Sequence, residues 1–397
     1  MAEWIEKSLG EIAEVTKLAG FEFTKYIKYN DDGEIIALRA LNLRNGELDL
    51  SDIKRISREV SEGLTRSKIY KDDILLTYTG NGYGDCAIIE ENDKYHLAPN
   101  ICKIVPNQNV IYPYYLYCYI RSKAFYNQMS NNMTGSGQPT IPMKTIRLLK
   151  IPVPDMSVQV KIANMIRSLN QKIRNNKVIN NNLEQQAQAI FANEFLSLDT
   201  LPEGWKQASL IDIADYLNGL AMQKYRPTAD ESGIPVLKIK ELRQGCCDDN
   251  SELCSPSIKS DYIIHDGDVI FSWSGSLLVD LWCGGICGLN QHLFKVTSSK
   301  YDKWFYYAWT KHHLDRFVAV AADKATTMGH IKRDELAKAE VLIPNEADYN
   351  RIGALLQPIY EMIISNRIEN KKLAATRDTL LPKLMNGEID MSEVDYE

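Results

Sequence analysis

Hydrophobic and polar residues follow the same order twice along the chain. Four segments of the first half return in the second half, and the loops between them differ in length. The matching pairs are residues 8–13 and 209–214, 39–46 and 238–245, 73–80 and 268–275, and 151–154 and 341–344. The spacing of about 195 residues is too long for a solenoid repeat. The pattern therefore predicts two copies of one domain.

Each copy begins with short β-type runs and ends in a long polar helix. In the first copy, runs such as 35–38, 73–77, 86–89 and 101–105 are bounded by Gly, Asn, Asp and Pro, which is typical of strands separated by turns. The expected domains are a β-rich domain at 1–156, a spacer helix at 157–197, a second β-rich domain at 198–345, a C-terminal helix at 346–386 and an acidic tail at 387–397.

Both helices carry apolar residues at the spacing of a heptad repeat, which predicts a seam against a partner helix. The predicted seam residues are Ile162, Ile166, Leu169, Ile173, Asn176, Asn180, Leu183, Ile352, Leu356, Ile363, Asn366, Asn370 and Leu373. Both helices place Asn at the same two seam positions, and an unmatched buried Asn is costly. This favours pairing of the two helices, antiparallel because the domains are repeated. The alternative is an amphipathic helix that lies on its own domain. Pro358 predicts a kink or a late start of the second helix.

The predicted fold class is therefore α+β. Two repeated β-rich domains are separated by two long helices, which pack as an antiparallel coiled coil with approximate two-fold symmetry.

Composition restricts the class of protein. The longest apolar run, Tyr114–Ile120, is far shorter than the 20 or so residues of a membrane span, and no secretory signal is recognised. The 8 cysteines are scattered, so we expect reduced thiols in a cytoplasmic protein. The net charge of −6 argues against a DNA-binding protein, which usually has a basic excess. Any DNA contact must come from a local basic face.

No catalytic motif is found. Tyr78–Gly84 is rich in glycine but precedes a strand-like run, whereas a phosphate-binding loop opens a helix, so a β-turn is expected. The chain has no GxxxxGK[ST] motif and no Asn-Pro-Pro-aromatic motif of an amino-methyltransferase. Pro154-Asp155 lacks the acid-x-Lys of a nuclease, and no Ser/His/acid triad is readable. We therefore predict no catalytic residue.

Two further clusters have a functional and a structural interpretation. A zinc site could use Cys246, Cys247, Cys254, Cys283, Cys287, His265 and His292. Their spacing matches structural zinc sites poorly, so buried free thiols and no metal site are expected, and a metal-dependent enzyme is kept only as a third hypothesis. The aromatic segment 112–126 could stack on bases, but helix packing is the preferred interpretation.

The repeated motifs resemble the specificity subunit of type I restriction–modification systems. Each copy opens with Trp and Ser-Leu-x-x-Ile-Ala. An expected strand end with the motif Leu-Arg-x-Gly follows, and then an expected hairpin with the motif Asp-(Ile/Val)-(Leu/Ile)-x-(Thr/Ser)-x-(Thr/Ser)-Gly. Ile151–Pro154 followed by Gln159 and Ile162 resembles the entry into the family's first conserved helix. Leu380–Ile389 (LLPKLMNGEI) resembles its C-terminal signature. The entry into the second helix, residues 344–348, lacks the Gln.

The resemblance implies a DNA-binding subunit without chemistry of its own. Each β-rich domain would be a target-recognition domain that reads one half of a bipartite site in double-stranded DNA. The helices would set the spacing and dock two methyltransferase subunits, which use S-adenosylmethionine to methylate adenine N6. A further restriction/translocase subunit would use ATP and Mg²⁺. The alternative is a coiled-coil scaffold protein that does not read DNA.

Helix length supports this geometry independently. A helix of about 40 residues is roughly 60 Å long, so readers at the ends of an antiparallel pair can sit about one DNA turn, roughly 34–36 Å, apart. Polar and basic loop residues are the predicted DNA contacts. They are Arg44, Thr79, Asn81, Tyr83, Ser136, Gln138 and Lys144 in the first domain, and Lys224, Arg226, Ser274, Ser276, Lys324, Thr326, Thr327, His330 and Lys332 in the second. For each of them the alternative is a solvated loop residue.

Overall fold

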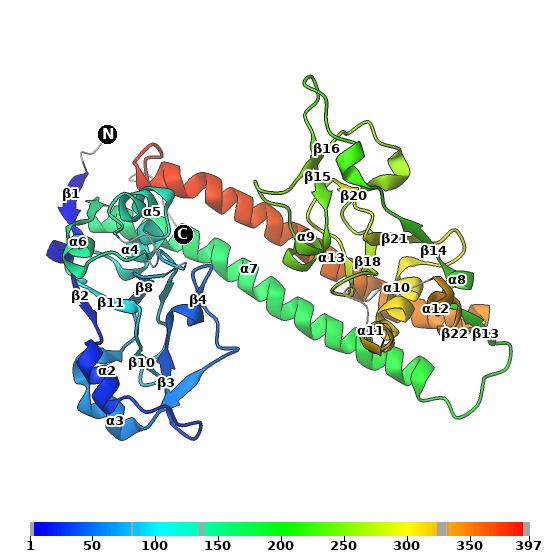
Figure 1. Cartoon of the computed structure of the whole chain (residues 1–397), viewed down its shortest axis with the longest axis horizontal. Coiled ribbons are helices and arrows are strands. Elements are labelled where there is room, and N and C mark those ends of the chain that lie inside the picture. The colour runs from blue at the N-terminus through cyan, green and yellow to red at the C-terminus, as the bar shows by residue number, and fades with distance from the viewer. Residues whose placement is uncertain (1–3, 81, 135–138, 324–330, 332, 392–397) are drawn as a thin grey trace. The chain divides into compact units, whose positions relative to one another are not determined.

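The chain divides into two compact units. The computed structural model describes residues 4–80, 82–134, 139–323, 331 and 333–391. Unit 1 contains residues 1–171 and 374–397, and unit 2 contains residues 172–373. Two long helices, α7 (Met156–Phe191) and α13 (Glu346–Met385), pass from one unit into the other (Figure 1). Each unit therefore consists of a β-rich body and one end of both helices.

The body of unit 1 combines an antiparallel sheet with a mixed sheet. The antiparallel sheet has the order β2-β11-β8-β9, and the mixed sheet has the order β6-β3-β10-β7 with β3 parallel to β10. These strands are β2 (Ala13–Lys17), β3 (Ile35–Leu38), β6 (Lys54–Ile56), β7 (Lys68–Ile69), β8 (Ile74–Thr77), β9 (Cys86–Ile88), β10 (Tyr95–Leu97) and β11 (Ile101–Pro106). β1 (Ile5–Ser8) pairs with β12 (Lys150–Val153), which brings the start of the body next to the entry into α7.

The body of unit 2 repeats this topology. Its sheets have the orders β14-β21-β18-β19 and β16-β15-β20-β17, with β15 parallel to β20, and β13 pairs with β22. The strands are β13 (Lys206–Ser209), β14 (Asp215–Asn218), β15 (Ile234–Leu237), β16 (Leu253–Cys254), β17 (Ile263–Ile264), β18 (Val269–Ser272), β19 (Leu278–Leu281), β20 (Cys287–Leu289), β21 (Leu293–Thr297) and β22 (Glu340–Ile343). The repeat in the sequence is thus a repeat of the fold.

One repeated segment differs between the copies. The Leu-Arg-x-Gly motif was expected to end a strand in both. In unit 1 it forms the hairpin of β4 (Leu43–Arg44) and β5 (Glu47–Leu48), because Asn45 and Gly46 adopt the positive φ angles that a tight hairpin turn needs. In unit 2 the motif lies in helix α9 (Ile239–Gln244), which ends at left-handed Gly245. The expectation of a strand end is therefore wrong for the second copy.

Aromatic helices fill the core of both bodies. Every residue of α4 (Pro113–Ile120) is buried, and seven consecutive residues of α10 (Lys303–His312), from Trp304 to Thr310, are buried. A helix that is apolar on all sides belongs in the interior. The interpretation of this segment as helix packing is confirmed for α4, whereas Tyr126 of α5 (Lys123–Ser130) is exposed.

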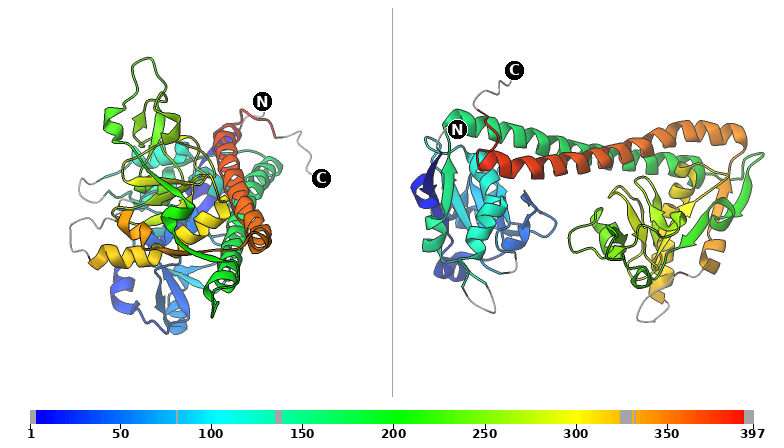
Figure 2. Two further views of the ribbon diagram at one scale, coloured as in Figure 1. Left: turned by 90° about the vertical axis from the view of Figure 1, so that its right-hand side faces the viewer. Right: turned by 90° about the horizontal axis from the view of Figure 1, so that it is seen from above.

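The first turns of each long helix pack on the body that precedes them. Ile162 and Ile166 of α7 belong to the core of unit 1, together with Leu384 of α13. Ile352, Leu356 and Ile363 of α13 belong to the core of unit 2, together with Ala187 and Phe191 of α7. Figure 2 shows the two helices side by side within each unit. The residues predicted for a helix–helix seam thus also attach each helix to its own domain, as the alternative interpretation held.

Asparagines join the two helices in antiparallel register. Asn176 donates its Nδ2 hydrogen to Asn370 Oδ1 (2.9 Å), and Asn366 donates to Asn180 Oδ1 (2.8 Å). The later asparagine of one helix thus faces the earlier one of the other. Half-buried apolar residues lie at the intervening seam positions. They are Leu169, Ile173, Leu183 and Leu373. The geometry of a coiled coil over the full length stays a prediction.

We expect the protein to lose stability when the Asn180–Asn366 pair is broken on one side only. Asn366→Leu should lower the free energy of unfolding by about 1–3 kcal/mol, because it leaves the buried Asn180 Oδ1 without the hydrogen bond that Asn366 donates. Changing both residues to leucine should recover that loss, since an apolar pair needs no hydrogen bond. Denaturant unfolding of both variants measures the difference. A double variant as unstable as the single one would contradict the pairing.

Pro358 does not delay the second helix. α13 begins at Glu346 and continues through Pro358 to Met385, so the expected late start is wrong, and a kink at Pro358 stays a prediction. Pro358 is exposed, while Ile352 and Leu356 on the turns before it are buried in the core of unit 2. Burial of such side chains offsets the hydrogen bond that a proline removes from a helix.

A buried histidine makes the stability of the protein depend on pH. His96 of β10 is fully buried, with Nδ1 2.9 Å from Leu97 O, and burial lowers its pKa. Below pH about 6.5 the unfolded chain takes up a proton at His96 that the folded body does not, so the contribution of His96 to stability falls by up to about 1.4 kcal/mol for each unit by which the pH is lowered. His96→Gln should flatten this loss between pH 7.5 and 5.5 in thermal unfolding. Identical slopes for both proteins would refute the assignment.

Candidate nucleic-acid interface

In unit 1 three segments meet where β8 ends. The backbone N–H of Tyr78 donates to Asn100 O (3.2 Å), and Tyr78 O accepts from the N–H of Ile141 (3.0 Å). The hydroxyl oxygens of Thr79 and Thr140 lie 2.6 Å apart. We call this junction, residues 78–80, 100 and 139–141, the corner of unit 1. It holds together the two loop regions that the sequence predicts to contact DNA.

Unit 2 builds the same junction where β18 ends. Trp273 N–H donates to His292 O (3.4 Å), and Trp273 O accepts from the N–H of Ile331 (3.0 Å). Ser274 Oγ lies 3.0 Å from His292 Nδ1. We call residues 273–274, 292 and 331 the corner of unit 2. Two segments far apart in the sequence thus use the same backbone hydrogen bonds in both copies.

Two residues that were predicted to contact DNA are buried in these corners. Thr79 is 9% exposed and Ser274 is 2% exposed, and the hydroxyl of each is within hydrogen-bond distance of a neighbouring side chain. Their hydroxyls join loops to each other. Direct reading of a base by either one would require the corner to open.

Other candidates of unit 1 lie at the surface. The Arg44 side chain is 65% exposed, and its Nη1 is 3.8 Å from Asp49 Oδ2. Tyr83 stacks on Tyr126 with ring centroids 5.2 Å apart and hydroxyl oxygens 2.6 Å apart. Lys144, in α6 (Met143–Leu148), is exposed. Sequence reasoning assigned Tyr126 to helix packing together with the other aromatics of residues 112–126, whereas its side chain is exposed.

The other described candidates of unit 2 are surface residues, and one of them is ion-paired. Lys224, at the end of the 3-10 helix Met222–Lys224, and Ser276 are exposed. Arg226 shares Glu252 with Lys238, at nitrogen–oxygen distances of 3.4 and 2.7 Å. A DNA phosphate would therefore compete with Glu252 for Arg226.

Half of the predicted DNA contacts lie outside the described residues. They are Asn81, Ser136, Gln138, Lys324, Thr326, Thr327, His330 and Lys332.

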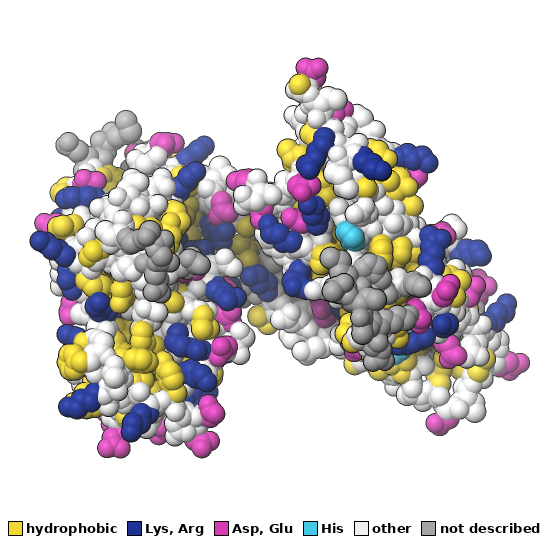
Figure 3. Space-filling model, in the orientation of Figure 1, with side chains coloured by type: hydrophobic (Ala, Val, Ile, Leu, Met, Phe, Trp, Pro, Cys, Tyr) yellow, Lys and Arg dark blue, Asp and Glu magenta, His cyan; other side chains and the backbone are white. Residues whose placement is uncertain are grey.

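The described surface mixes both signs of charge. Figure 3 shows Lys and Arg side chains over the part of unit 2 formed by α9, β15 and β16, with acidic side chains between them. On unit 1 the two signs are also intermixed on this face. A protein with a net charge of −6 thus presents basic groups locally.

An ion pair, buried in unit 1 and partly buried in unit 2, lies at the start of each strand that leads to a corner. Lys103 Nζ lies 3.9 Å from Asp73 Oδ2 in unit 1, and Lys295 Nζ lies 2.9 Å from Asp268 Oδ2 in unit 2. Burial raises the pKa of Asp73 to about 6 and lowers the pKa of Lys103. Each aspartate also accepts the backbone N–H of the residue three positions before it, at 2.8 and 2.9 Å. These pairs fix the start of β8 and β18, the strands that lead to the corners.

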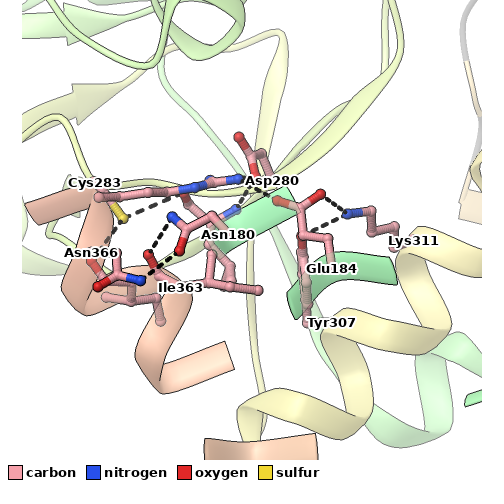
Figure 4. Close-up of polar contacts among 11 residues, drawn as sticks. Asn180, Glu184, Asp280, Cys283, Tyr307, Lys311, Ile363 and Asn366 are labelled. Atoms are coloured by element: carbon pink, nitrogen blue, oxygen red, sulfur yellow. Dashed lines mark hydrogen bonds and ion pairs between the residues drawn. The ribbon is translucent and has the colours of Figure 1, made fainter. Parts of the chain in front are cut away.

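A charged network attaches the body of unit 2 to both helices. Arg367 of α13 donates from Nη1 to Asp280 Oδ1 of β19 (2.8 Å) and from Nη2 to Glu184 Oε1 of α7 (2.9 Å). Glu184 Oε2 accepts from Lys311 Nζ of α10 (3.4 Å), which also donates to Tyr307 Oη (3.3 Å). Figure 4 shows Glu184, Asp280, Tyr307 and Lys311 of this network beside the Asn180–Asn366 pair. The network fixes how this body sits on its helices.

The described residues contain no cluster of three or more His, Cys, Asp or Glu side chains that could hold a metal ion. Cys247 Sγ lies 3.7 Å from Cys287 Sγ, and every cysteine is a free thiol.

The glycine-rich segment after Tyr78 connects β8 to β9, so the expected turn between strands is confirmed. Within the same described ranges, no helix has the length and apolar character to cross a membrane.

Comparison with known proteins agrees with the duplicated fold. The family model described as "Type I restriction modification DNA specificity domain" matches residues 1–185 and 202–375, once in each copy. The specificity subunit of the type I restriction enzyme MjaIX of Methanocaldococcus jannaschii is 26% identical over 422 residues, covering 99% of this chain and 95% of that protein. The specificity subunit of HindI of Haemophilus influenzae is 21% identical over 471 residues, covering 98% and 100%.

A solved structure shows the same fold. The S subunit of a type I restriction–modification system from M. genitalium superposes with a TM-score of 0.60 at 13% identity, over 98% of this chain and 97% of that one. The family model covers most of the chain in both copies, and the two relatives that match over the whole length are specificity subunits of type I restriction enzymes. The chain belongs to the family of DNA specificity subunits of type I restriction–modification systems.

Proposed function

We propose that each body reads one half of a bipartite DNA sequence. The observation that carries this proposal is the duplicated corner, in which the same backbone hydrogen bonds join the same two loop regions in both units. Each body has a core of its own. A recognition surface built twice on separate cores can read two half-sites independently, as dimeric DNA-binding proteins do with two identical subunits.

The two long helices would act as the spacer and as the docking site for two methyltransferase subunits. The spacer role follows from their continuity, since α7 and α13 each pass from one unit into the other. The chain itself would do no chemistry. Adenine N6 methylation would belong to the methyltransferase subunits, with S-adenosylmethionine as cofactor, and cleavage to a restriction/translocase subunit that uses ATP and Mg²⁺.

Footprinting of the complex with its methyltransferase tests the DNA-reading role. We expect protection of a sequence with two separate conserved parts and an unspecified spacer. If the assembled complex binds DNA without sequence preference, the chain is a scaffold and the proposal fails.

Exchange of one body tests the independence of the half-sites. Replacing residues 1–156 with the corresponding domain of another family member should change only one half of the methylated sequence. The other half should stay as it was, because its reader and its core are untouched. A change in both halves would refute independent reading.

A further inference from the structure

A tyrosine and an arginine from α4 hold the turn of the β4–β5 hairpin. Tyr117 is 4% exposed, and its hydroxyl donates to Gly46 O at 2.6 Å. Arg121, directly after α4, donates from Nη1 to Tyr117 Oη (3.2 Å) and from Nη2 to Asn45 O (3.0 Å). Both carbonyls of the tight turn are therefore bound by side chains that lie more than 70 residues away in the sequence.

The base of the same hairpin is fixed as well. Asn42 is fully buried and donates its Nδ2 hydrogens to the carbonyls of Asp49 and Asp52, both at 2.8 Å. Arg44 lies between the fixed base and the fixed turn. Its own side chain is 65% exposed, and its Nη1 is too far from Asp49 Oδ2, at 3.8 Å, for a hydrogen bond. The hairpin thus combines an immobilised backbone with a guanidinium head that faces solvent.

Unit 2 uses the equivalent pair for a different purpose. Lys311 and Tyr307 have the same spacing on α10 and the same contact, with Lys311 Nζ donating to Tyr307 Oη at 3.3 Å. In unit 2 Lys311 Nζ also donates to Glu184 Oε2 of α7 at 3.4 Å. The segment that corresponds to the β4–β5 hairpin is the helix α9. The fixation of a hairpin turn by this pair is therefore a feature of unit 1 and not a general requirement of the repeated fold.

We propose that Tyr117 and Arg121 are positioning residues for Arg44, which contacts DNA in the first half-site. This inference rests on the proposed function. An arginine held at a fixed backbone position can present its planar donors to a guanine edge, or to a phosphate oxygen, with little loss of conformational entropy on binding. Removing the Tyr117 hydroxyl releases the turn and misplaces the guanidinium, although neither Tyr117 nor Arg121 needs to contact DNA.

Coupling between Tyr117 and Arg44 is the decisive measurement. The complete complex is first allowed to methylate a random-sequence DNA library, and the methylated adenines identify its recognition site. The probe is a DNA duplex that carries this site. Arg44→Ala should weaken binding of the complex to this duplex about tenfold, the effect of one lost bidentate contact. Tyr117→Phe should weaken it about threefold or more. In the Arg44→Ala background, Tyr117→Phe should add less than a twofold change, because the residue it positions is gone.

Tyr115→Phe is the matched control. Tyr115 is a fully buried tyrosine of the same helix, and its hydroxyl donates to Pro152 O at 2.9 Å, away from the hairpin. Both changes remove one buried hydroxyl from a backbone carbonyl, so they should lower the thermal stability similarly. Only Tyr117→Phe should weaken DNA binding and relax base preference in one half-site. Arg121→Lys provides a second variant with the same expected coupling, because a lysine replaces the two donors by a single point charge.

The outcomes separate this inference from the proposed function. If the unaltered complex shows no bipartite preference, the proposed function fails. If that preference is present but Tyr117→Phe weakens binding equally with and without Arg44, the positioning role is wrong. Loss of binding to the specific duplex alone assigns Arg44 to a base, whereas equal loss on an unrelated duplex with a shallower salt dependence assigns it to a phosphate. An Arg44→Ala variant that binds like the unaltered complex overturns the inference.

Discussion

Arg367→Met should lower the free energy of unfolding by about 2–4 kcal/mol. The change leaves Asp280 and Glu184 without the guanidinium that both of them bind, at 2.8 and 2.9 Å, in a partly buried place between α13, α7 and β19. The carbonyl of Leu281 loses a donor as well. The loss should be largely insensitive to salt, because partly buried charges are screened less than exposed ones. Denaturant unfolding at low and high ionic strength measures both effects.

Arg351→Met is the matched control for this prediction. Arg351 also lies on α13 and also binds a glutamate of the segment that continues α7, with Nη1 and Nη2 at 3.0 and 2.7 Å from the two Glu194 oxygens. Its side chain is 52% exposed, against 27% for Arg367. Glu194 is itself 16% exposed, but the Arg351 head is half exposed to solvent, so we expect a smaller loss of about 1 kcal/mol. Equal losses for the two variants would show that burial of the Arg367 network does not matter.

Gly219→Ala should destabilise the protein by about 3 kcal/mol and disturb the corner of unit 2. Gly219 directly follows β14, and its N–H donates to Leu293 O at 3.0 Å. A methyl group at this position would collide with the backbone carbonyl oxygen of Asn290, two residues before His292. Backbone atoms cannot move aside as a flexible side chain does, so one strand must shift. Thermal unfolding measures the loss.

Gly63→Ala is the corresponding control. Gly63 is the last residue of α3 (Arg58–Gly63), and a methyl group there would meet no atom within 4 Å. Alanine has a higher helix propensity than glycine, so this variant should be neutral or slightly more stable. If Gly219→Ala were tolerated equally well, the close approach of the two backbones would not be a constraint on the fold.

The candidate site was predictable from sequence only in part. Polar side chains near the strand ends, such as Thr79 and Ser274, were predicted to contact DNA from loops, but their hydroxyls are buried in the junctions where those loops meet. Whether a hydroxyl is free to contact a ligand depends on a partner that lies far away in the chain. Thr140 is 61 residues from Thr79, and no local pattern connects the two.

The sequence pattern was sufficient to predict the duplication, the strand-rich bodies and the two long helices. Repeated motifs, alternation and heptad spacing can be recognised from the order of residues along the chain alone. The expected helices at 157–197 and 346–386 agree with Met156–Phe191, extended by a π-helical turn at Ala192–Leu196, and with Glu346–Met385. Tertiary structure alone decided that Leu-Arg-x-Gly becomes a hairpin in one copy and a helix in the other. It also decided that the Tyr117–Arg121 pair binds the turn of a hairpin, whereas the Lys311 cation of the equivalent pair binds Glu184 of α7. These choices depend on which surfaces meet after folding, and contacts between segments 70 or more residues apart leave no trace in the local spacing of apolar residues.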